Sequence, residues 1–415
     1  MLMEIRRDVY LNRLIARKHN GLIKVITGIR RCGKSYLLDP IFRNHLINSG
    51  VPADHIIKIE LDRPENIRFH KNMEAFSRHL HSLIKDQGQY YVLLDEIQLV
   101  DGFEFLLNGL LYERNIDVYV TGSNSKFLSS DIITEFRGRG DRVHLWPLSF
   151  SEYYSACGGD RNKCWYDYLT YGGMPLTITM QDDEDKASYL KNLMEQTYFA
   201  DIVGRNHIKR KDVLDAVVNQ LASSVGSLTN PKKIHDTFRS NGEKELSINT
   251  INAYLSYLED SFLVSKALRY DVKGRKYIGT PQKYYFSDLG LRNARLNFRQ
   301  QEETHLMENA LYNELLFRGY NVDVGVVEIR ENNKRVQTEV DFVCNKSSNR
   351  IYIQSVLTLS SRDKTAQESR PLNLIGDNFK KMIVVKDAIR EWRTDDGILV
   401  MGITDFLLDQ DSLER

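Results

Sequence analysis

The sequence Gly28-Ile29-Arg30-Arg31-Cys32-Gly33-Lys34-Ser35 decides the fold of the first part of this chain. It follows an apolar run over residues 22–27, which predicts a strand, and it leads into Tyr36-Leu37-Leu38, which predicts a helix. A G-x-x-x-x-G-K-[ST] sequence between a strand and a helix is the pattern of a phosphate-binding loop. Its glycines let backbone N–H groups turn toward phosphate oxygens, because no Cβ stands in the way.

This loop predicts a nucleotide site. The residues expected to bind the nucleotide are Gly28, Ile29, Arg30, Arg31, Cys32, Gly33, Lys34, Ser35 and Tyr36. Lys34 is expected to act in catalysis by reaching the β- and γ-phosphates, and Ser35 to give an oxygen to Mg²⁺. The sequence has no Asn-Lys-x-Asp tetrapeptide that would read guanine, so ATP with Mg²⁺ is the predicted cofactor pair. The alternative is a glycine-containing surface turn.

Composition sets the broad class of the protein. A chain of 415 residues is too long for a single compact core, so we expect more than one domain. Its 42% of hydrophobic and 27% of charged residues are ordinary for a water-soluble globular protein. The net charge of +1 gives no global attraction to nucleic acid or membrane, so such a partner must use a local patch. The four cysteines show no C-x-x-C pair, and no apolar run is long enough to span a membrane. We therefore expect a cytoplasmic protein without a membrane partner.

Strand patterns alternate with helical ones over residues 1–150, which predicts a doubly wound parallel sheet. Strands are expected at 56–61, 90–96, 117–121 and 142–146, with helices at 4–18 and 73–85. The apolar run 90–96 ends in Asp95 and Glu96. Because ligands bind at the carboxyl ends of parallel strands, these acids and the Gly28 loop are expected at two neighbouring strand tips. Asp95 would hold Mg²⁺ and Glu96 would act as general base for the attacking water.

Two further stretches carry candidate catalytic residues. Thr121-Gly122-Ser123-Asn124-Ser125 ends a predicted strand, and Asn124 or Ser123 is expected to contact the γ-phosphate or the water, unless the turn only satisfies its own backbone. Arg137 and Arg139 precede the next strand, where an arginine finger onto a neighbouring subunit's phosphate is the functional interpretation. The alternative is an arginine-rich helix end followed by glycine.

Residues 151–205 are expected to form a helical lid, and residues 206–290 a winged helix. The second prediction rests on three helical patterns followed by strands at 264–270 and 283–286, the element order of that fold. Its basic residues are Lys232, Lys233, Arg239, Lys273, Arg275 and Lys276. They predict contact with DNA phosphates, whereas nearby acids favour the alternative of a protein-contact module.

Residues 291–415 predict a small α/β domain. Strands are expected at 321–326, 338–343, 350–356 and 382–385. Glu308, Asp341 and Gln354 have the order of a nuclease metal site, but an amide replaces the third carboxylate and Val356 replaces the expected lysine. An amide is a poor Mg²⁺ ligand and valine cannot stabilise developing charge, so we interpret this as a vestigial second metal site without cleavage activity.

Several motifs occur together in one order along nearly the whole chain. They are Gly28 to Ser35, Leu94-Asp95-Glu96-Ile97-Gln98, Thr121 to Ser125, Arg137-Gly138-Arg139, Pro147-Leu148-Ser149-Phe150-x-Glu152-Tyr153, Tyr171-Gly172-Gly173-x-Pro175, Asp201-Ile202, Tyr284-Tyr285-Phe286-x-Asp288-x-Gly290-Leu291 and Glu308-Asn309. As a set they resemble the bacterial and archaeal AAA+-type ATPases that end in a domain of unknown function. The resemblance implies an AAA+-like ATPase core, a winged helix and a restriction-endonuclease-like C-terminal domain.

The sequence thus predicts four parts: an ATPase core at 1–150, a lid at 151–205, a winged helix at 206–290 and a C-terminal domain at 291–415. The leading hypothesis is Mg²⁺-dependent ATP hydrolysis coupled to conformational switching on DNA or a protein client, with a homo-oligomer as one arrangement. The first alternative is an ATP-gated DNA-binding module in which hydrolysis is slow and incidental. The second is a metal-dependent nuclease.

Overall fold

The computed structural model describes residues 5–122, 138–240, 246–299, 302–331 and 334–415. The chain forms two compact units, Met1–Pro147 with Asp260–Phe262, and Leu148–Glu259 with Leu263–Arg415. The predicted division of the chain into an ATPase core, a lid, a winged helix and a C-terminal domain stays a prediction.

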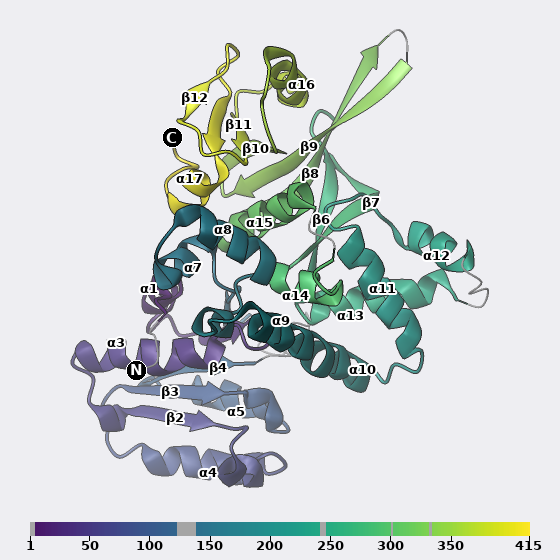
Figure 1. Cartoon of the computed structure of the whole chain (residues 1–415). Helices are drawn as coiled ribbons and strands as arrows, with labels where there is room; N and C mark the ends of the chain where they lie inside the picture. Colours follow the sequence, from purple (N-terminus) through teal and green to yellow (C-terminus); the bar gives the residue numbers. More distant parts are fainter. Residues whose placement is uncertain (1–4, 123–137, 241–245, 300–301, 332–333) are drawn as a thin grey trace. The chain divides into compact units, whose positions relative to one another are not determined.

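A parallel sheet of five strands in the order β2-β3-β4-β1-β5 forms the centre of the first unit (Figure 1). The strands are β1 (Ile23–Thr27), β2 (Ile56–Glu60), β3 (Tyr90–Asp95), β4 (Ile116–Thr121) and β5 (Gly140–His144). All four pairings are parallel, which confirms the predicted α/β sheet. One detail of the prediction is wrong: β4 lies between β1 and β3, so the tips of those two strands are not neighbours.

Helices cover both faces of this sheet, and Figure 1 shows α3 and α4 on opposite sides. They are α1 (Asp8–Ile15), α2 (Lys34–Tyr36), a π-helical turn Leu37–Phe42, α3 (Arg43–Asn48), α4 (Met73–Leu83) and α5 (Phe103–Leu110), with 3-10 turns at Ala53–His55, Pro64–Phe69 and Ile97–Leu99. Phe76 of α4 and Leu107 of α5 are buried in one core with Leu94 of β3. On the other face, the rings of Phe42 and Tyr119 lie 4.6 Å apart.

Local sequence explains where these elements begin. All six residues of β3 are buried, as expected of a central strand in a parallel sheet that is covered on both faces. The side chain of Asn72 accepts a hydrogen bond from the N–H of Ala75, which caps α4 at its predicted start. The first helix is shorter than the predicted range 4–18, and β5 begins two residues before the predicted 142–146.

The second unit begins with a helical region. The helices of the whole second unit are α7 (Phe150–Cys157), α8 (Arg161–Tyr171), α9 (Asp183–Asn192), α10 (Ala200–Arg205), α11 (Lys211–Ser223), α12 (Pro231–Ser240), α13 (Ile248–Asp260), α14 (Leu289–Arg295), α15 (Glu303–Phe317), α16 (Arg362–Asn373) and α17 (Ile403–Leu408), with a 3-10 turn Pro175–Thr179 and a π-helical turn Leu193–Phe199. Helix α14 packs against α8, α9 and α11 and so holds this region together.

Two of the sequence motifs meet at α14. Asp288 caps this helix by accepting from the N–H of Leu291, and its other oxygen accepts from the N–H of Gly173 at 2.7 Å. A Cβ on Gly172, whose φ is +71°, would lie 2.4 Å from the Asp288 carboxylate. A Cβ on Gly290 would lie 2.1 Å from the carbonyl oxygen of Tyr171. These glycines are therefore required by the close approach of two backbone segments.

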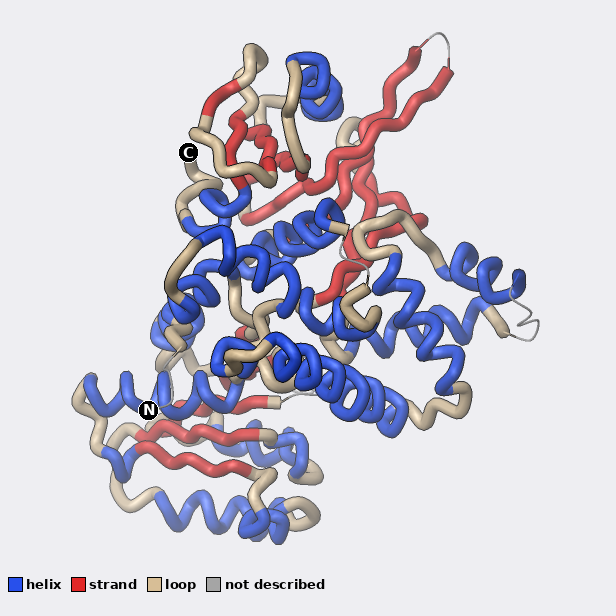
Figure 2. Tube along the Cα trace, viewed as in Figure 1, coloured by secondary structure: helices blue, strands red, loops and turns tan. Residues whose placement is uncertain are grey.

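An eight-stranded sheet forms the rest of the second unit, in the order β12-β13-β11-β10-β9-β8-β6-β7 (Figure 2). The strands are β6 (Val264–Asp271), β7 (Lys276–Phe286), β8 (Asn321–Glu331), β9 (Lys334–Lys346), β10 (Asn349–Val356), β11 (Lys380–Val385), β12 (Trp392–Arg393) and β13 (Leu399–Gly402). The hairpin β6–β7, predicted as the wing of a winged helix, joins the C-terminal strands through a parallel pairing of β6 with β8. Among the described residues, no helix is long and apolar enough to cross a membrane.

Candidate functional site

The loop after β1 is held by its glycines and by the neighbouring strand. Gly28, Arg31 and Gly33 have φ values of +147°, +64° and +101°. A Cβ on Gly28 would lie 2.2 Å from the carbonyl oxygen of Leu145, the residue that follows β5. Only glycine fits there without moving the backbone. Ile29 and Cys32 are buried, whereas Arg30, Arg31, Ser35 and Tyr36 are exposed along the outer side of the loop.

Lys34 lies inside this loop. Its side chain is buried, and its ammonium donates hydrogen bonds to the carbonyl oxygens of Gly28 and Ile29, both at 3.0 Å. Two backbone carbonyl groups of the loop thus hold this cation. This is the arrangement expected of a P-loop lysine, which faces phosphate oxygens when a nucleotide is bound.

Asp95 ends β3 and is buried at 7% exposure. The hydroxyl of Thr121, the last residue of β4, donates a hydrogen bond to Asp95, and the nearby side chain of Ser35 lowers the pKa of the same carboxylate. Burial raises the pKa of Asp95, with smaller contributions from the charges of Glu96 and Asp62. A desolvated carboxylate beside a hydroxyl oxygen is a donor set that suits Mg²⁺, which prefers oxygen ligands.

Glu96 is half-buried and has a left-handed backbone conformation, with φ at +52°. Its N–H donates to the hydroxyl oxygen of Thr121 at 3.0 Å, and its carboxylate accepts a hydrogen bond from the side chain of Gln98. The hydroxyl of Thr121 therefore bonds at once to the carboxylate of Asp95 and to the backbone N–H of Glu96. From the sequence, Thr121 is predicted only as the end of a strand. The signal in the sequence that could have indicated its role is a polar residue at the end of an apolar strand, in the same sheet as the Gly28 loop.

Two groups behind the loop were also missed. Arg7 is 4% exposed, and its guanidinium donates to the carbonyl oxygens of Cys32 at 3.4 Å and Trp146 at 2.7 Å. His144 lies 3.1 Å from the hydroxyl of Thr27, and burial, with the nearby charge of Arg142, keeps its pKa well below the usual value. These groups support the loop from the core side, which no short sequence pattern reveals.

The described part of the structure places none of the remaining predicted catalytic residues at this loop. Asn124 and Arg137 lie outside the described residues. Arg139 precedes β5, and its carbonyl oxygen accepts from the N–H of Ile23 at the start of β1. Its guanidinium lies over the ring of Tyr112, 5.7 Å from the ring centre. Because the Gly28 loop follows the other end of β1, Arg139 is distant from the loop of its own chain.

The predicted second metal site forms a buried cluster around a lysine. Lys283 of β7 lies 2.9 Å from Glu308, 2.8 Å from Glu339 and 3.8 Å from Asp341, measured between its Nζ and one carboxylate oxygen of each. The side chain of Gln354 accepts from the N–H of Asp341 at 3.4 Å. The structure thus brings Glu308, Asp341 and Gln354 together. Lys283, whose ammonium lies among these acids, is not among the site residues predicted from the sequence.

The charged groups of this cluster shift one another's pKa values. Burial raises the pKa of Asp341 to about 8, and the charge of Glu308 adds to this shift, while Lys283 opposes it. Burial by itself would lower the pKa of Lys283, but the carboxylates, Glu308 first, raise it overall. Among the described residues, no group of three or more His, Cys, Asp or Glu side chains is arranged to hold a metal ion.

The chain is similar to several known families and proteins. A family model described as an AAA domain matches residues 20–154, and a domain of unknown function, DUF8612, matches residues 162–302. An uncharacterized protein of Haemophilus influenzae is 34% identical over 410 residues, covering 97% of this chain and 98% of that protein. A second, from Methanocaldococcus jannaschii, is 28% identical over 396 residues, covering 92% and 84%. A solved Walker-type ATPase of Pyrococcus abyssi has a TM-score of 0.49 at 15% identity, covering 71% of this chain and 96% of that one.

Residues 20–154 match an AAA domain, and the parallel sheet with its Gly28 loop lies within them. The chain belongs to the same family as the Haemophilus influenzae protein. The match of residues 20–154 to an AAA domain indicates ATP binding and hydrolysis.

Proposed function

We propose that this chain binds ATP with Mg²⁺ at the Gly28 loop and hydrolyses it there. The observation that carries the proposal is the hydrogen-bonded set at the ends of β3 and β4, in which the hydroxyl of Thr121 bonds to the carboxylate of Asp95 and to the backbone N–H of Glu96. Ser35 lies near enough to the same carboxylate to lower its pKa. These residues come from distant parts of the sequence, and each has the chemistry that one step of phosphoryl transfer requires. A surface turn has no need of such a set.

Each residue has a separate role in this proposal. The backbone N–H groups of residues 28–36 bind phosphate oxygens, and Lys34 turns from the carbonyl oxygens of its own loop to the β- and γ-phosphates. Ser35 and Asp95 hold Mg²⁺, which neutralises charge on the phosphates. Glu96 orients the attacking water and accepts its proton, while Thr121 positions both acids.

The remaining predicted roles belong to the same proposal. Asn124 contacts the γ-phosphate or the water, and Arg137 or Arg139 reaches the phosphate of a neighbouring copy in a homo-oligomer. The position of Arg139, at the far end of β5 from its own loop, favours action on a neighbour. Hydrolysis drives conformational switching on DNA or a protein client in the cytoplasm.

ATP hydrolysis by purified variants tests the proposal. We expect Lys34→Ala to lose ATP binding. Glu96→Gln should bind ATP but hydrolyse it about 100-fold more slowly than wild type. Lys71→Ala, which removes an exposed lysine of the same unit, is the matched control and should behave as wild type. Equal hydrolysis by all four proteins, or no ATP binding by any, would refute the assignment.

A second candidate, an ATP-gated DNA-binding module, is favoured by helix α12. Lys232 and Lys233 are exposed there, beside Asn230 and Thr237 in one shallow hollow. Such cations would contact duplex phosphates, so binding should weaken steeply with salt and change on adding ATP. Absence of duplex binding at low salt would remove this candidate.

We do not propose nuclease activity. The Lys283 ammonium lies among the acids of the second cluster, and Gln354 supplies an amide where a carboxylate is needed. Nicking of a plasmid with Mg²⁺ or Mn²⁺, abolished by Asp341→Ala, would contradict this view.

A further inference from the structure

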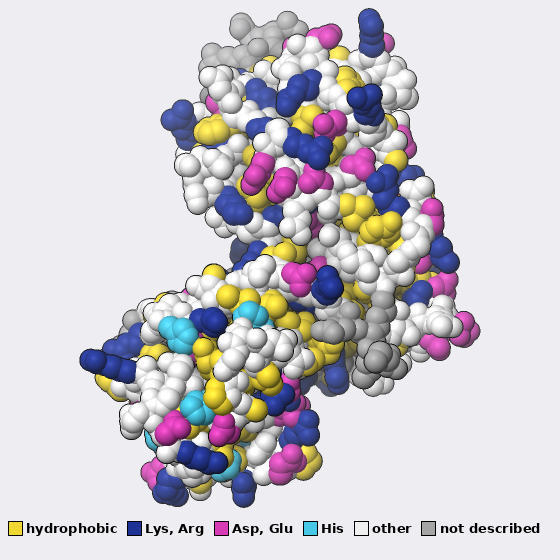
Figure 3. Space-filling model, turned by 90° about the vertical axis from the view of Figure 1, so that its left-hand side faces the viewer, with side chains coloured by type: hydrophobic (Ala, Val, Ile, Leu, Met, Phe, Trp, Pro, Cys, Tyr) yellow, Lys and Arg dark blue, Asp and Glu magenta, His cyan; other side chains and the backbone are white. Residues whose placement is uncertain are grey.

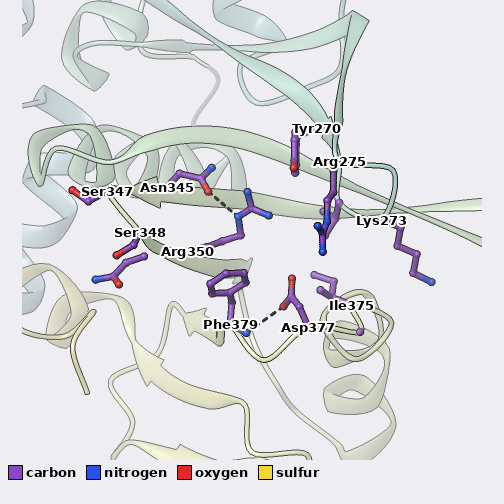
Figure 4. A pocket seen from close by; sticks show the side chains of 13 residues that line it. Tyr270, Lys273, Arg275, Asn345, Ser347, Ser348, Arg350, Ile375, Asp377 and Phe379 are labelled. Atoms are coloured by element: carbon purple, nitrogen blue, oxygen red, sulfur yellow. Dashed lines mark hydrogen bonds between the residues drawn. The ribbon is translucent and has the colours of Figure 1, made fainter.

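A cavity of about 610 Å³ opens in the second unit, away from the cluster around Lys283. Three segments line it: residues 270–275 at the β6–β7 turn, residues 345–350 at the β9–β10 turn, and residues 375–379 before β11 (Figure 4). Its volume falls within the range of about 300–1,000 Å³ that is usual for small-ligand sites. None of these residues belongs to the unit that carries the Gly28 loop.

The cavity has an excess of positive charge. Lys273, Arg275 and Arg350 line it, against one carboxylate, that of Asp377. That carboxylate already accepts hydrogen bonds from the hydroxyl of Tyr352 at 2.6 Å and from the N–H of Phe379 at 3.2 Å. Among the residues that the structure describes, neither Lys273 nor Arg275 has an acidic side chain within ion-pair distance. Both are exposed, so an anion can reach them.

Aromatic rings flank the central arginine. The Arg350 guanidinium lies 5.2 Å from the ring centre of Tyr270 and 5.6 Å from that of Phe379. Its Nε donates to the side-chain oxygen of Asn345 at 2.8 Å, which fixes its position. Figure 4 shows Arg350 between the two rings and Arg275 directed toward the same space. Phe379 is 42% exposed, so part of its ring is available to a ligand.

On the face drawn in Figure 3, lysine and arginine side chains are interspersed with aspartate and glutamate. The net charge of the whole chain is only +1. An anionic partner must therefore be recognised by a local set of groups.

We propose that this cavity binds a nucleotide unit of single-stranded nucleic acid. Lys273 and Arg275 contact the phosphate, and the base stacks on Phe379 beside Arg350. Cations combined with an exposed aromatic ring are the means by which proteins bind single strands, because every base has a face that can stack. A duplex keeps its bases paired and stacked, so it cannot present one to Phe379. The site goes beyond the proposed ATPase and does not depend on it.

Fluorescence anisotropy tests this site, with a labelled oligothymidylate of about 20 nucleotides as the probe and no ATP present. We expect Phe379→Ala to weaken binding about tenfold, since stacking of one base contributes about 1–3 kcal/mol. Lys273→Glu with Arg275→Glu should weaken binding at least as much and make the dependence on salt shallower. Lys209→Glu with Lys211→Glu reverses two exposed cations elsewhere in the same unit and should leave binding unchanged.

Two further probes identify the ligand. An abasic oligonucleotide should bind wild type more weakly than oligothymidylate and should bind Phe379→Ala and wild type equally. A mononucleotide should compete poorly, because it lacks the neighbouring phosphates of a strand. Mononucleotide binding as tight as that of the strand would overturn the proposal in favour of a free-nucleotide site.

Comparison with the ATP site separates the two proposals. Lys34→Ala should bind oligothymidylate as wild type does, even though we expect it to lose ATP. No binding of the strand by wild type at low salt would refute the cavity proposal and leave the ATPase proposal untouched. Equal loss in the cavity variants and in the Lys209 and Lys211 control would also refute it.

Discussion

The hydroxyl of Thr121 donates a hydrogen bond to the carboxylate of Asp95, and the same oxygen accepts from the N–H of Glu96. One small side chain at the end of β4 thus joins both acids that follow β3. Because β4 lies between β1 and β3, its last residue is placed between the Gly28 loop, which follows β1, and the acids at the end of β3. The order of the strands therefore matters for the chemistry as well as for the fold.

Replacement of Thr121 tests this link. Thr121→Val keeps the shape but removes the hydroxyl, so Asp95 loses a donor and the N–H of Glu96 loses its acceptor. An unsatisfied buried group costs about 1–3 kcal/mol, so we expect kcat for ATP to fall about tenfold or more with a smaller change in KM. Thr121→Ser should restore most of the rate. Equal rates for the valine and serine variants would show that the hydroxyl is not used.

Gly28→Ala tests the close approach of the loop to β5. The added Cβ would meet the carbonyl oxygen of Leu145 at 2.2 Å, so the loop must shift. We expect weaker ATP binding, measured by calorimetric titration, and a lower melting temperature. Gly109→Ala in α5 is the matched control, because nothing lies within 4 Å of its Cβ position, and its stability should be unchanged or higher. Similar behaviour of the two variants would contradict the geometry of the loop.

Lys283→Met tests the buried cluster of the second unit. It removes the cation shared by Glu308, Glu339 and Asp341. We expect a loss of about 3–5 kcal/mol in the free energy of unfolding at pH 8 and a smaller loss at pH 5, because Asp341, whose pKa is raised to about 8, carries its proton at pH 5. Urea denaturation measures both values, with Lys276→Met at an exposed position of the same strand as the control. A loss that does not depend on pH would count against an ionic cluster.

Asp341→Asn tests the pH dependence of the second unit. The pKa of Asp341 is raised to about 8 in the folded chain, against about 4 in an unfolded one. Between these values the folded unit holds a proton that the unfolded chain releases, so the free energy of unfolding falls as pH rises. The asparagine variant should have a slope shallower by up to about 1.4 kcal/mol per pH unit. Parallel curves for the variant and wild type, measured from pH 5 to 8, would show that Asp341 holds no such proton.

Sequence patterns predict those parts of the structure that depend on neighbouring residues. The strands of the first unit follow from apolar runs, and the loop follows from glycines at fixed spacing. Asp95 was found because it closes a buried strand. Boundaries were less accurate, as for β5, since strand ends are set by pairing with β1.

The contacts that sequence could not predict join residues far apart in the chain. Arg7 reaches Cys32, and Lys283 of β7 reaches Glu308, through packing that no local pattern encodes. The pairing of β6 with β8 is of the same kind, and it places the predicted wing in the C-terminal sheet. Thr121 lies between these cases, because its strand was predicted but its two hydrogen bonds were not.

Equilibrium binding and turnover of ATP by Glu96→Gln, measured beside Lys34→Ala in the same Mg²⁺ buffer, test the central claim most directly. We expect the glutamine variant to bind ATP as tightly as wild type and to release phosphate about 100-fold more slowly, while the alanine variant does not bind. Undiminished ATP binding and phosphate release in both variants would contradict the claim that the loop around Lys34 and the acids after β3 form one ATP-hydrolysing site.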